Sequence, residues 1–223
     1  MTGQLDSLDP DAELEHRRHR HWYDRLMMLC DGVFAISITL LAAEIRVPAG
    51  WGGDWAGLWS SLAGQLDAYA MSFLVISVYW LAHRRFMALI TKVDAPVTVL
   101  TLVMLGLVAL LPATTRMISA YGLSAVARLT YAGLVIAIGL TMATLWAYAA
   151  LIAQHIPAQV NIRLRWFFLL LMALTPPFFL ALVLALPANT PGLNPVILAA
   201  LFLIGWRLRA WMVRRMGGKP HIA

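Results

Sequence analysis

The segment "RLMMLCDGVFAISITLLAAEIRVP", which runs from Arg25 to Pro48, decides the fold class. Its twelve residues from Gly32 to Ala43 carry no charge, and they directly follow an aspartate, Asp31. A helix needs about 20 apolar residues to span the hydrocarbon core of a bilayer. The segment is therefore predicted to form a membrane helix with a carboxylate near one end.

The composition extends this prediction to the whole chain. Of its 223 residues, 61% are hydrophobic and 13% are charged, whereas a soluble domain is nearer half apolar and a quarter charged. Pro112 and the pair Pro176–Pro177 fall inside apolar segments and predict kinks, since proline removes a backbone donor. The sequence predicts an all-α, polytopic membrane protein with six transmembrane helices, at Leu26–Ile45, Leu66–Ala88, Ala95–Thr115, Val126–Ile156, Trp166–Leu186 and Pro195–Val213.

The basic residues orient these helices. With a cytoplasmic N-terminus, fourteen lysines and arginines fall on inside segments and three fall outside, namely Arg46, Arg116 and Arg128. This bias predicts that both termini are cytoplasmic. It also argues against a nucleic-acid partner, because the charge is spread over every inside connection. The basic tail "RLRAWMVRRMGGKPH" is suited to contact with membrane lipids.

The predicted organisation has three parts. Residues 1–24 form a cytoplasmic N-terminal segment, helical from about Arg17, residues 25–215 form the six-helix transmembrane domain, and residues 216–223 form a cytoplasmic tail. Trp51, Trp55 and Trp59 recur at a spacing of four before the second helix and predict an interfacial helical turn.

Signals for catalysis or metal binding are weak. There is no nucleophile elbow, phosphate-binding glycine loop or metal-spaced histidine pair, so no enzyme, cofactor or metal site is predicted. Ionisable residues near the membrane helices are few and therefore informative. Arg25, Asp31, His83 and Asp94 all fall toward the predicted cytoplasmic side. Asp31 needs a partner there, and Arg25 and His83 are the predicted ones; a network that joins helices and direct contact with a permeating ion both remain open.

One face of the first helix has the pattern of a pore lining. Ile36, Leu40 and Ala43 lie at i, i+4 and i+7 and share a face, with Thr39 beside it. Four copies of this helix around an axis would enclose a narrow apolar path with that face. Ordinary helix packing produces the same stripe, so the periodicity alone does not separate the two.

The first three helices resemble the transmembrane protein 175 family of endolysosomal potassium channels and its bacterial relatives. The family hallmark is R-x-x-x-F-S-D, followed by a G-V-F-A-I-A-I-T-L-L-like run. Arg25 and Asp31 match the hallmark, Leu29 and Cys30 replace its Phe and Ser, and the run from Gly32 to Leu41 matches closely. The segments "SFLVISVYWLAHRRF", with Trp80 and His83, and "LVALLPATTR" are also similar to the family.

This resemblance implies a bacterial inner-membrane channel for potassium ions. The family fold is a homotetramer without a P-loop, in which the first helices line one pore. Ile36, Leu40 and the position of Ala43 then form the apolar constriction, with Thr39 linked to potassium preference. Ala43 stands where the family usually has leucine, so it widens the outer ring.

A second group of residues is implied to anchor the pore helix, and it comprises Arg25, Cys30, Asp31, Trp80, His83 and Asp94. Cys30 loses the hydroxyl that the family serine supplies, so this layer is expected to be looser here.

Two other functions remain as alternatives. A proton-coupled secondary transporter would use Asp31 and His83 as a relay, although the two halves of the chain show no convincing inverted repeat. A non-transporting membrane scaffold is equally compatible with the hydropathy.

Overall fold

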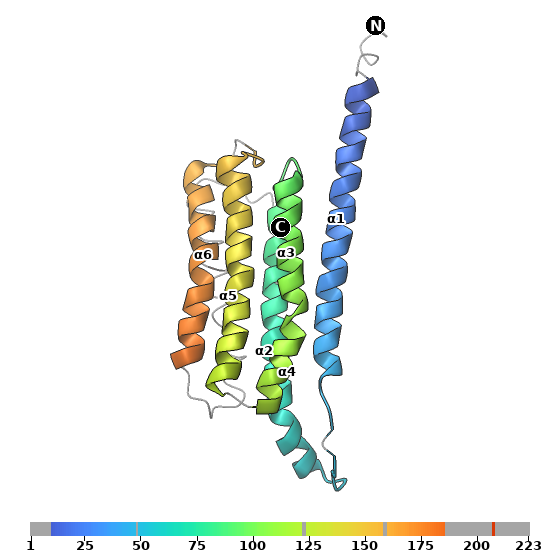
Figure 1. The fold of residues 1–223 in the computed structure, drawn as a ribbon, viewed down its shortest axis with the longest axis vertical. Helices are drawn as coiled ribbons and strands as arrows, with labels where there is room; N and C mark the ends of the chain where they lie inside the picture. Colours follow the sequence, from blue (N-terminus) through green and yellow to red (C-terminus); the bar gives the residue numbers. More distant parts are fainter. Residues whose placement is uncertain (1–9, 48, 122–123, 158–159, 186–206, 208–223) are drawn as a thin grey trace.

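The computed structural model describes residues 10–47, 49–121, 124–157, 160–185 and 207, and these form long helices lying side by side (Figure 1). All regular structure in these residues is helical. Among the described residues, four helical segments are long and apolar enough to cross a membrane, at His21–Ala43, Trp55–Met87, Ala95–Tyr121 and Ala125–Ile152. The chain is an all-α integral membrane protein.

Helix α1, Pro10–Ala43, is 34 residues long, or about 50 Å at 1.5 Å per residue. It stands at one side of the bundle, and its N-terminal turns extend beyond the ends of the other helices (Figure 1). The helix begins before the predicted start at Arg17. Residues 11–31 contain neither proline nor glycine, and a proline at the first helical position is favourable, so the polar segment continues the membrane helix without a break.

Helix α2, Trp55–Met87, also begins before its predicted start at Leu66. The Asp54 carboxylate caps it by accepting a 2.7 Å hydrogen bond from the backbone N–H of Gly57. A Cβ at Gly57 would lie only 2.8 Å from the Asp54 Oδ1, so a larger residue there would displace the capping carboxylate from this position. Trp55 and Trp59 lie in the first two turns with strongly exposed rings, as predicted. Trp51 precedes the helix, contrary to the prediction, and its indole N–H donates to the carbonyl of Asp54 at 2.8 Å.

The third predicted helix is interrupted, as Pro112 predicted. Helix α3 is Ala95–Ala109, helix α4 is Leu111–Tyr121, and the break falls at Leu110. Pro112 enters at the start of α4, where its missing N–H is tolerated.

The fourth and fifth apolar segments are helical as predicted. Helix α5, Ala125–Ala147, ends in a π-helical turn, Tyr148–Ile152, and α6 covers Ile162–Ala185. Helix α6 runs through Pro176 and Pro177 as one segment. The sixth predicted helix, Pro195–Val213, lies outside the described residues except for Arg207.

The core is apolar, but three hydroxyl groups from different helices are hydrogen-bonded to one another within it. The Ser72 hydroxyl on α2 lies 2.7 Å from the Thr115 hydroxyl on α4 and donates to the Tyr131 hydroxyl on α5 at 3.2 Å. All three residues are buried. Since the membrane offers no water to these groups, their mutual hydrogen bonds fix the register of three helices.

Candidate functional site: one face of helix α1 and two polar contacts

Helix α1 has one buried and one uncovered face within the protomer. The buried stripe follows helical spacing and consists of Leu26, Cys30, Phe34, Ser37 and Leu41. The opposite face is exposed and is also apolar; its members are Met28, Leu29, Ile36, Leu40, Ala42 and Ala43, with Thr39 among them. In lipid an apolar exposed face is tolerated, so exposure alone does not assign a role to it.

The predicted pore residues all lie on this uncovered face. Ile36 is 59% exposed and Leu40 is 48% exposed, and Thr39 and Ala43 are exposed as well. The Thr39 hydroxyl donates a 2.9 Å hydrogen bond to the carbonyl of Ile36. Its donor is therefore used within the helix, and the lone pairs of its oxygen are left to face outward.

The structure gives Asp31 a different partner from the predicted ones. The indole Nε1–H of Trp80 on α2 donates to Oδ1 of Asp31 at 2.7 Å. The guanidinium of Arg84, one turn further along α2, lies over the Trp80 ring at 5.3 Å. The charge-assisted hydrogen bond between Trp80 and Asp31 thus joins α1 to α2, and the cation–π contact of Arg84 lies within α2 and steadies the Trp80 ring.

The other predicted anchoring residues lie near this contact but do not join it. His83 is buried, its ring centroid lies 6.3 Å from that of Phe34, and its Nε2 has no hydrogen-bond partner among the described residues. Cys30 is buried in the α1 stripe. Arg25 is exposed, and no ion pair links it to Asp31 in the part of the chain that the structure describes.

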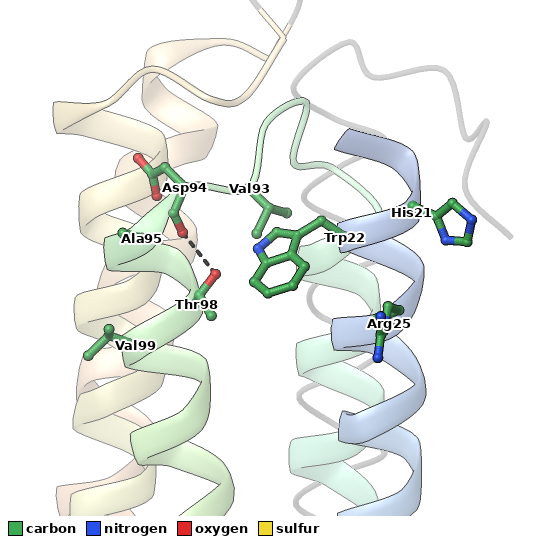
Figure 2. A pocket seen from close by; sticks show the side chains of 8 residues that line it. All are labelled: His21, Trp22, Arg25, Val93, Asp94, Ala95, Thr98 and Val99. Carbon is green, nitrogen blue, oxygen red and sulfur yellow. Dashed lines mark hydrogen bonds between the residues drawn. The ribbon is translucent and has the colours of Figure 1, made fainter. Parts of the chain in front are cut away.

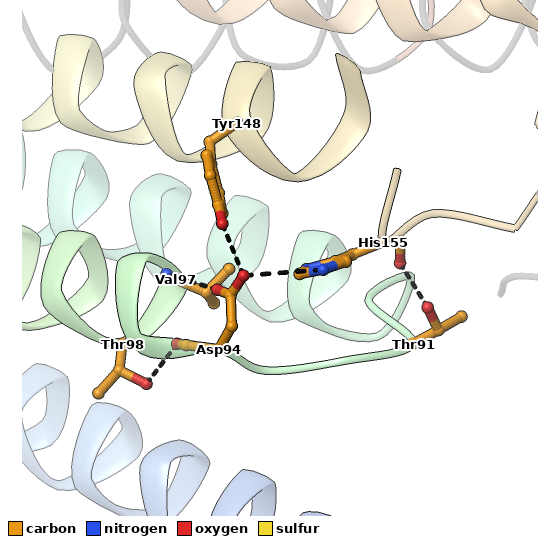
Figure 3. A network of polar contacts seen from close by, with 6 residues as sticks. All are labelled: Thr91, Asp94, Val97, Thr98, Tyr148 and His155. Carbon is orange, nitrogen blue, oxygen red and sulfur yellow. Dashed lines mark hydrogen bonds and ion pairs between the residues drawn. The ribbon is translucent and has the colours of Figure 1, made fainter. Parts of the chain in front are cut away.

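Asp94 belongs to a second polar contact, shown in Figure 3. It caps α3 by accepting a 3.0 Å hydrogen bond from the N–H of Val97, and its other oxygen accepts a 2.6 Å bond from the hydroxyl of Tyr148. The Nε2 of His155 lies 3.7 Å from that same oxygen. The π-helical turn at the end of α5 carries Tyr148, so this irregular segment is tied to the start of α3.

Hydrogen bonding controls the charge state of Asp94. Partial burial by itself raises the pKa of this carboxyl. The hydrogen bonds from Tyr148 and from the backbone of Val97, together with nearby His155, favour the charged form. Their combined effect is larger, so the pKa of Asp94 lies below its ordinary value of 3.8. A lowered pKa means that Asp94 stabilises the fold above that value and loses this contribution as the pH falls through the folded-state pKa.

Replacing Asp94 by Asn should destabilise the protein by about 1 kcal/mol at neutral pH. Asparagine keeps the helix cap but loses the charge-assisted bond to Tyr148. Thermal unfolding in detergent should show the gap between wild type and Asp94→Asn closing as the pH falls from about 5 to 3. Asp54→Asn, which changes an N-cap aspartate at the other end of the bundle, serves as the control. A gap that stays constant over this pH range contradicts the assignment.

An arginine that sequence analysis passed over holds the loop next to this contact. The guanidinium of Arg165 on α6 donates to the carbonyls of Ala150, Ile156 and Pro157 at 2.7, 3.1 and 3.0 Å, and its Nε donates to that of Val160. These carbonyls follow the end of α5, where a cation is also favoured by the helix dipole. Arg165 therefore fixes the segment that carries His155.

The opposite end of the bundle has its own contacts. Arg116 on α4 lies 3.5 Å from the carboxylate of Glu44 at the end of α1. The side chain of Gln65 on α2 accepts from the N–H of Arg46 at 2.9 Å and donates to its carbonyl at 3.0 Å. These contacts hold the C-terminal end of α1 against α2 and α4.

Known proteins share both the sequence pattern and the fold. Residues 25–112 match the family described as "Endosomal/lysosomal potassium channel TMEM175". The resemblance to the TMEM175 family is confirmed. The TMEM175 match runs from Arg25 on α1 to Pro112 on α4, which is the part of the chain where the motifs occur.

The relatives are bacterial proteins named as potassium channels. The chain is 37% identical over 129 residues to one from Streptomyces collinus, and this match covers 55% of this chain and 62% of the relative. It is 36% identical over 132 residues to one from Chamaesiphon minutus, and this match covers 56% of this chain and 65% of the relative. It thus spans less than two thirds of the length of either relative.

The fold matches a solved TMEM175 structure. A crystal structure described as a lysosomal potassium-selective channel TMEM175 homolog from Chamaesiphon minutus superposes with a TM-score of 0.66 at 27% sequence identity. The match covers 85% of this chain and 98% of the other.

Proposed function

We propose that this chain is a potassium-permeable cation channel. The observation that carries the proposal is the similarity of the chain to two bacterial relatives named potassium channels and to a family described as a potassium channel. The uncovered apolar face of α1, on which Ile36, Thr39, Leu40 and Ala43 are all exposed in the protomer, is compatible with a pore lining.

The proposed assembly is a homotetramer of six-helix subunits. Four α1 helices surround one pore, Ile36, Leu40 and Ala43 form its apolar constriction, and potassium ions and membrane lipids are the partners. Contact with symmetry-related copies would cover a face that the protomer leaves open. The proposed location is the bacterial inner membrane, as for the family that the chain resembles, and the bias of lysine and arginine supports cytoplasmic termini. In this assembly the Asp31–Trp80 hydrogen bond anchors α1, and the anchoring roles of Arg25, Cys30, His83 and Asp94 stay predictions.

A proton-permeable channel is the second candidate. A rat relative named "Endosomal/lysosomal proton channel TMEM175" is 30% identical over 104 residues, which is 47% of this chain and 20% of that protein. A proton path needs no wide pore, so an apolar constriction is compatible with it as well.

Reversal potentials in planar bilayers test these functions. With a potassium gradient at equal pH, we expect the reversal potential of the purified full chain to move toward the potassium equilibrium potential. A shift only under a pH gradient assigns the proton channel. A reversal potential that depends on both gradients in a fixed ratio indicates a coupled transporter, and the absence of current above protein-free bilayers indicates a scaffold.

A further inference from the structure

The uncovered face of α1 runs along the whole membrane-spanning part of the helix. Trp22 and Leu40 are 18 residues apart, which is about five helical turns, so their side chains share this face. At its N-terminal end a cavity of about 740 Å³ is lined by Trp22 and Arg25 of α1 and by Thr98 of α3 (Figure 2). This cavity therefore belongs to the face that the proposed assembly closes, and the charged residues at the other end of α1 lie outside it.

An ion pair lies at that other end. Glu44 directly follows Ala43, and it continues the row of Ile36 and Leu40 at a spacing of four residues. The carboxylate Oε2 of Glu44 lies 3.5 Å from the Nε of Arg116 on α4. The Glu44 side chain is 27% exposed and the Arg116 side chain is 61% exposed, so the protomer encloses neither charge.

Other contacts already hold this end of α1. The Gln65 side chain on α2 accepts from the N–H of Arg46 at 2.9 Å and donates to its carbonyl at 3.0 Å. An ion pair with an exposed partner contributes little to stability, because water competes for both charges and salt screens them. The Glu44–Arg116 pair is therefore better suited to act through its electric field than as a clamp.

The field of this pair reaches an ion that enters the proposed pore. In a tetramer of α1 helices, four copies of each charge surround the mouth next to Ala43, so the effect of one pair is repeated four times. Exposed charges act over about one Debye length, which is about 30 Å at 0.01 M salt and about 3 Å at 1 M. At low salt the carboxylate therefore attracts cations to the mouth without having to point at the axis.

The two charges of the pair act on a cation in opposite directions. The Glu44 carboxylate attracts it, whereas the Arg116 guanidinium repels it and weakens the attraction of its partner. Arg46, two residues after Glu44, is exposed and adds a second positive charge. We propose that the Glu44–Arg116 pair sets the rate at which cations enter this mouth of the pore, and that Arg116 limits the attraction by Glu44. This inference rests on the proposed channel and on α1 as its lining.

Single-channel conductance of the full chain in planar bilayers, with equal potassium chloride on both sides, tests the pair. At about 0.01 M salt, we expect Glu44→Gln to lower the conductance about threefold and Arg116→Gln to raise it about threefold. At about 1 M both differences should vanish, because the charges are screened. The double variant loses one charge of each sign and should lie near wild type at both salt concentrations.

Arg128→Gln is the matched control. Arg128 lies near the start of α5, which stands on the other side of α3 and α4 from α1 (Figure 1), so its loss removes the same charge further from the pore and should change the conductance less. Changes of the same sign in Glu44→Gln and Arg116→Gln indicate a structural contact and overturn the inference. Changes that persist at 1 M salt, or an equal effect of Arg128→Gln, overturn it as well. These outcomes leave the channel intact if wild type conducts, whereas the absence of wild-type current refutes the channel and the inference together.

Discussion

Replacing Leu40 by Asn should raise ion flux on the order of tenfold and weaken the preference for potassium over sodium. If four α1 helices enclose the pore, Leu40 meets its symmetry mates on the axis, and an apolar ring resists ions by staying dry. From Ile36 to Ala43 the helix rises about 10 Å, so the apolar throat is short and one polar ring should wet much of it. The measurement is single-channel conductance together with the reversal potential, with potassium on one side and sodium on the other.

Thr39→Val tests the polar side chain that lies beside the apolar ring of the proposed pore. The Thr39 hydroxyl donates to the carbonyl of Ile36, so its outward lone pairs are the polar feature that valine removes with little change in shape. We expect lower potassium preference with conductance near that of wild type.

The control for both variants lies on another helix. Leu170 on α6 is 54% exposed, close to the exposure of Leu40, and Leu170→Asn should leave the reversal potential unchanged. If Leu40→Asn and Thr39→Val both keep wild-type conductance and reversal potential, α1 does not line the pore.

Hydropathy predicted most of the fold because membrane helices need long apolar runs. The boundaries were less accurate where polar residues continue a helix. Residues 10–24 extend α1 although none of them needs to be in the membrane, and the Asp54 cap starts α2 well before the apolar run at Leu66. The interruption at Leu110 followed from Pro112, because a missing backbone donor is a local property of the sequence.

The partner of Asp31 could not be read from charge alone. Arg25 is six residues away, and at about 100° per residue the two side chains point about 120° apart on an ideal helix. The partner is instead the neutral indole of Trp80, 49 residues along the chain. The resemblance of the segment with Trp80 and His83 to the family drew attention to Trp80, but only helix packing shows that its N–H, rather than His83, reaches the carboxylate.

The sequence indicates the helix cap at Asp94 but not the contacts of Asp94 with Tyr148 and His155. An aspartate before "AP" at a helix start is a recognisable cap. Tyr148 and His155 lie 54 and 61 residues later and reach Asp94 through the π-helical turn and the loop that Arg165 holds. A π-helical turn depends on tertiary contacts, so no local pattern signalled it.

Removing the indole donor of Trp80 should destabilise the protein by about 2 kcal/mol. The Nε1–Oδ1 bond of 2.7 Å is charge-assisted, and hydrogen bonds to charged groups contribute about 1.5–3 kcal/mol. Trp80→Phe keeps an aromatic ring under Arg84 but loses the N–H, and Asp31→Asn keeps an acceptor but loses the charge. Thermal or denaturant unfolding of the detergent-solubilised protein measures each loss, and Trp59→Phe, on an exposed ring in the second turn of α2, should cost little.

Double variants show which residue is the partner of Asp31 on α1. Because Asp31 and Trp80 share one bond, their combined loss should be smaller than the sum of the single losses by about 1 kcal/mol or more. Asp31 and Arg25 share no ion pair in the described part of the chain, so Asp31→Asn and Arg25→Gln should be additive. Coupling of Asp31 to Arg25 and not to Trp80 would reverse this assignment and restore the pairing that the sequence predicted. If the anchor is Trp80, its loss should also lower channel current, since α1 is then free to rotate Ile36 and Leu40 away from the axis.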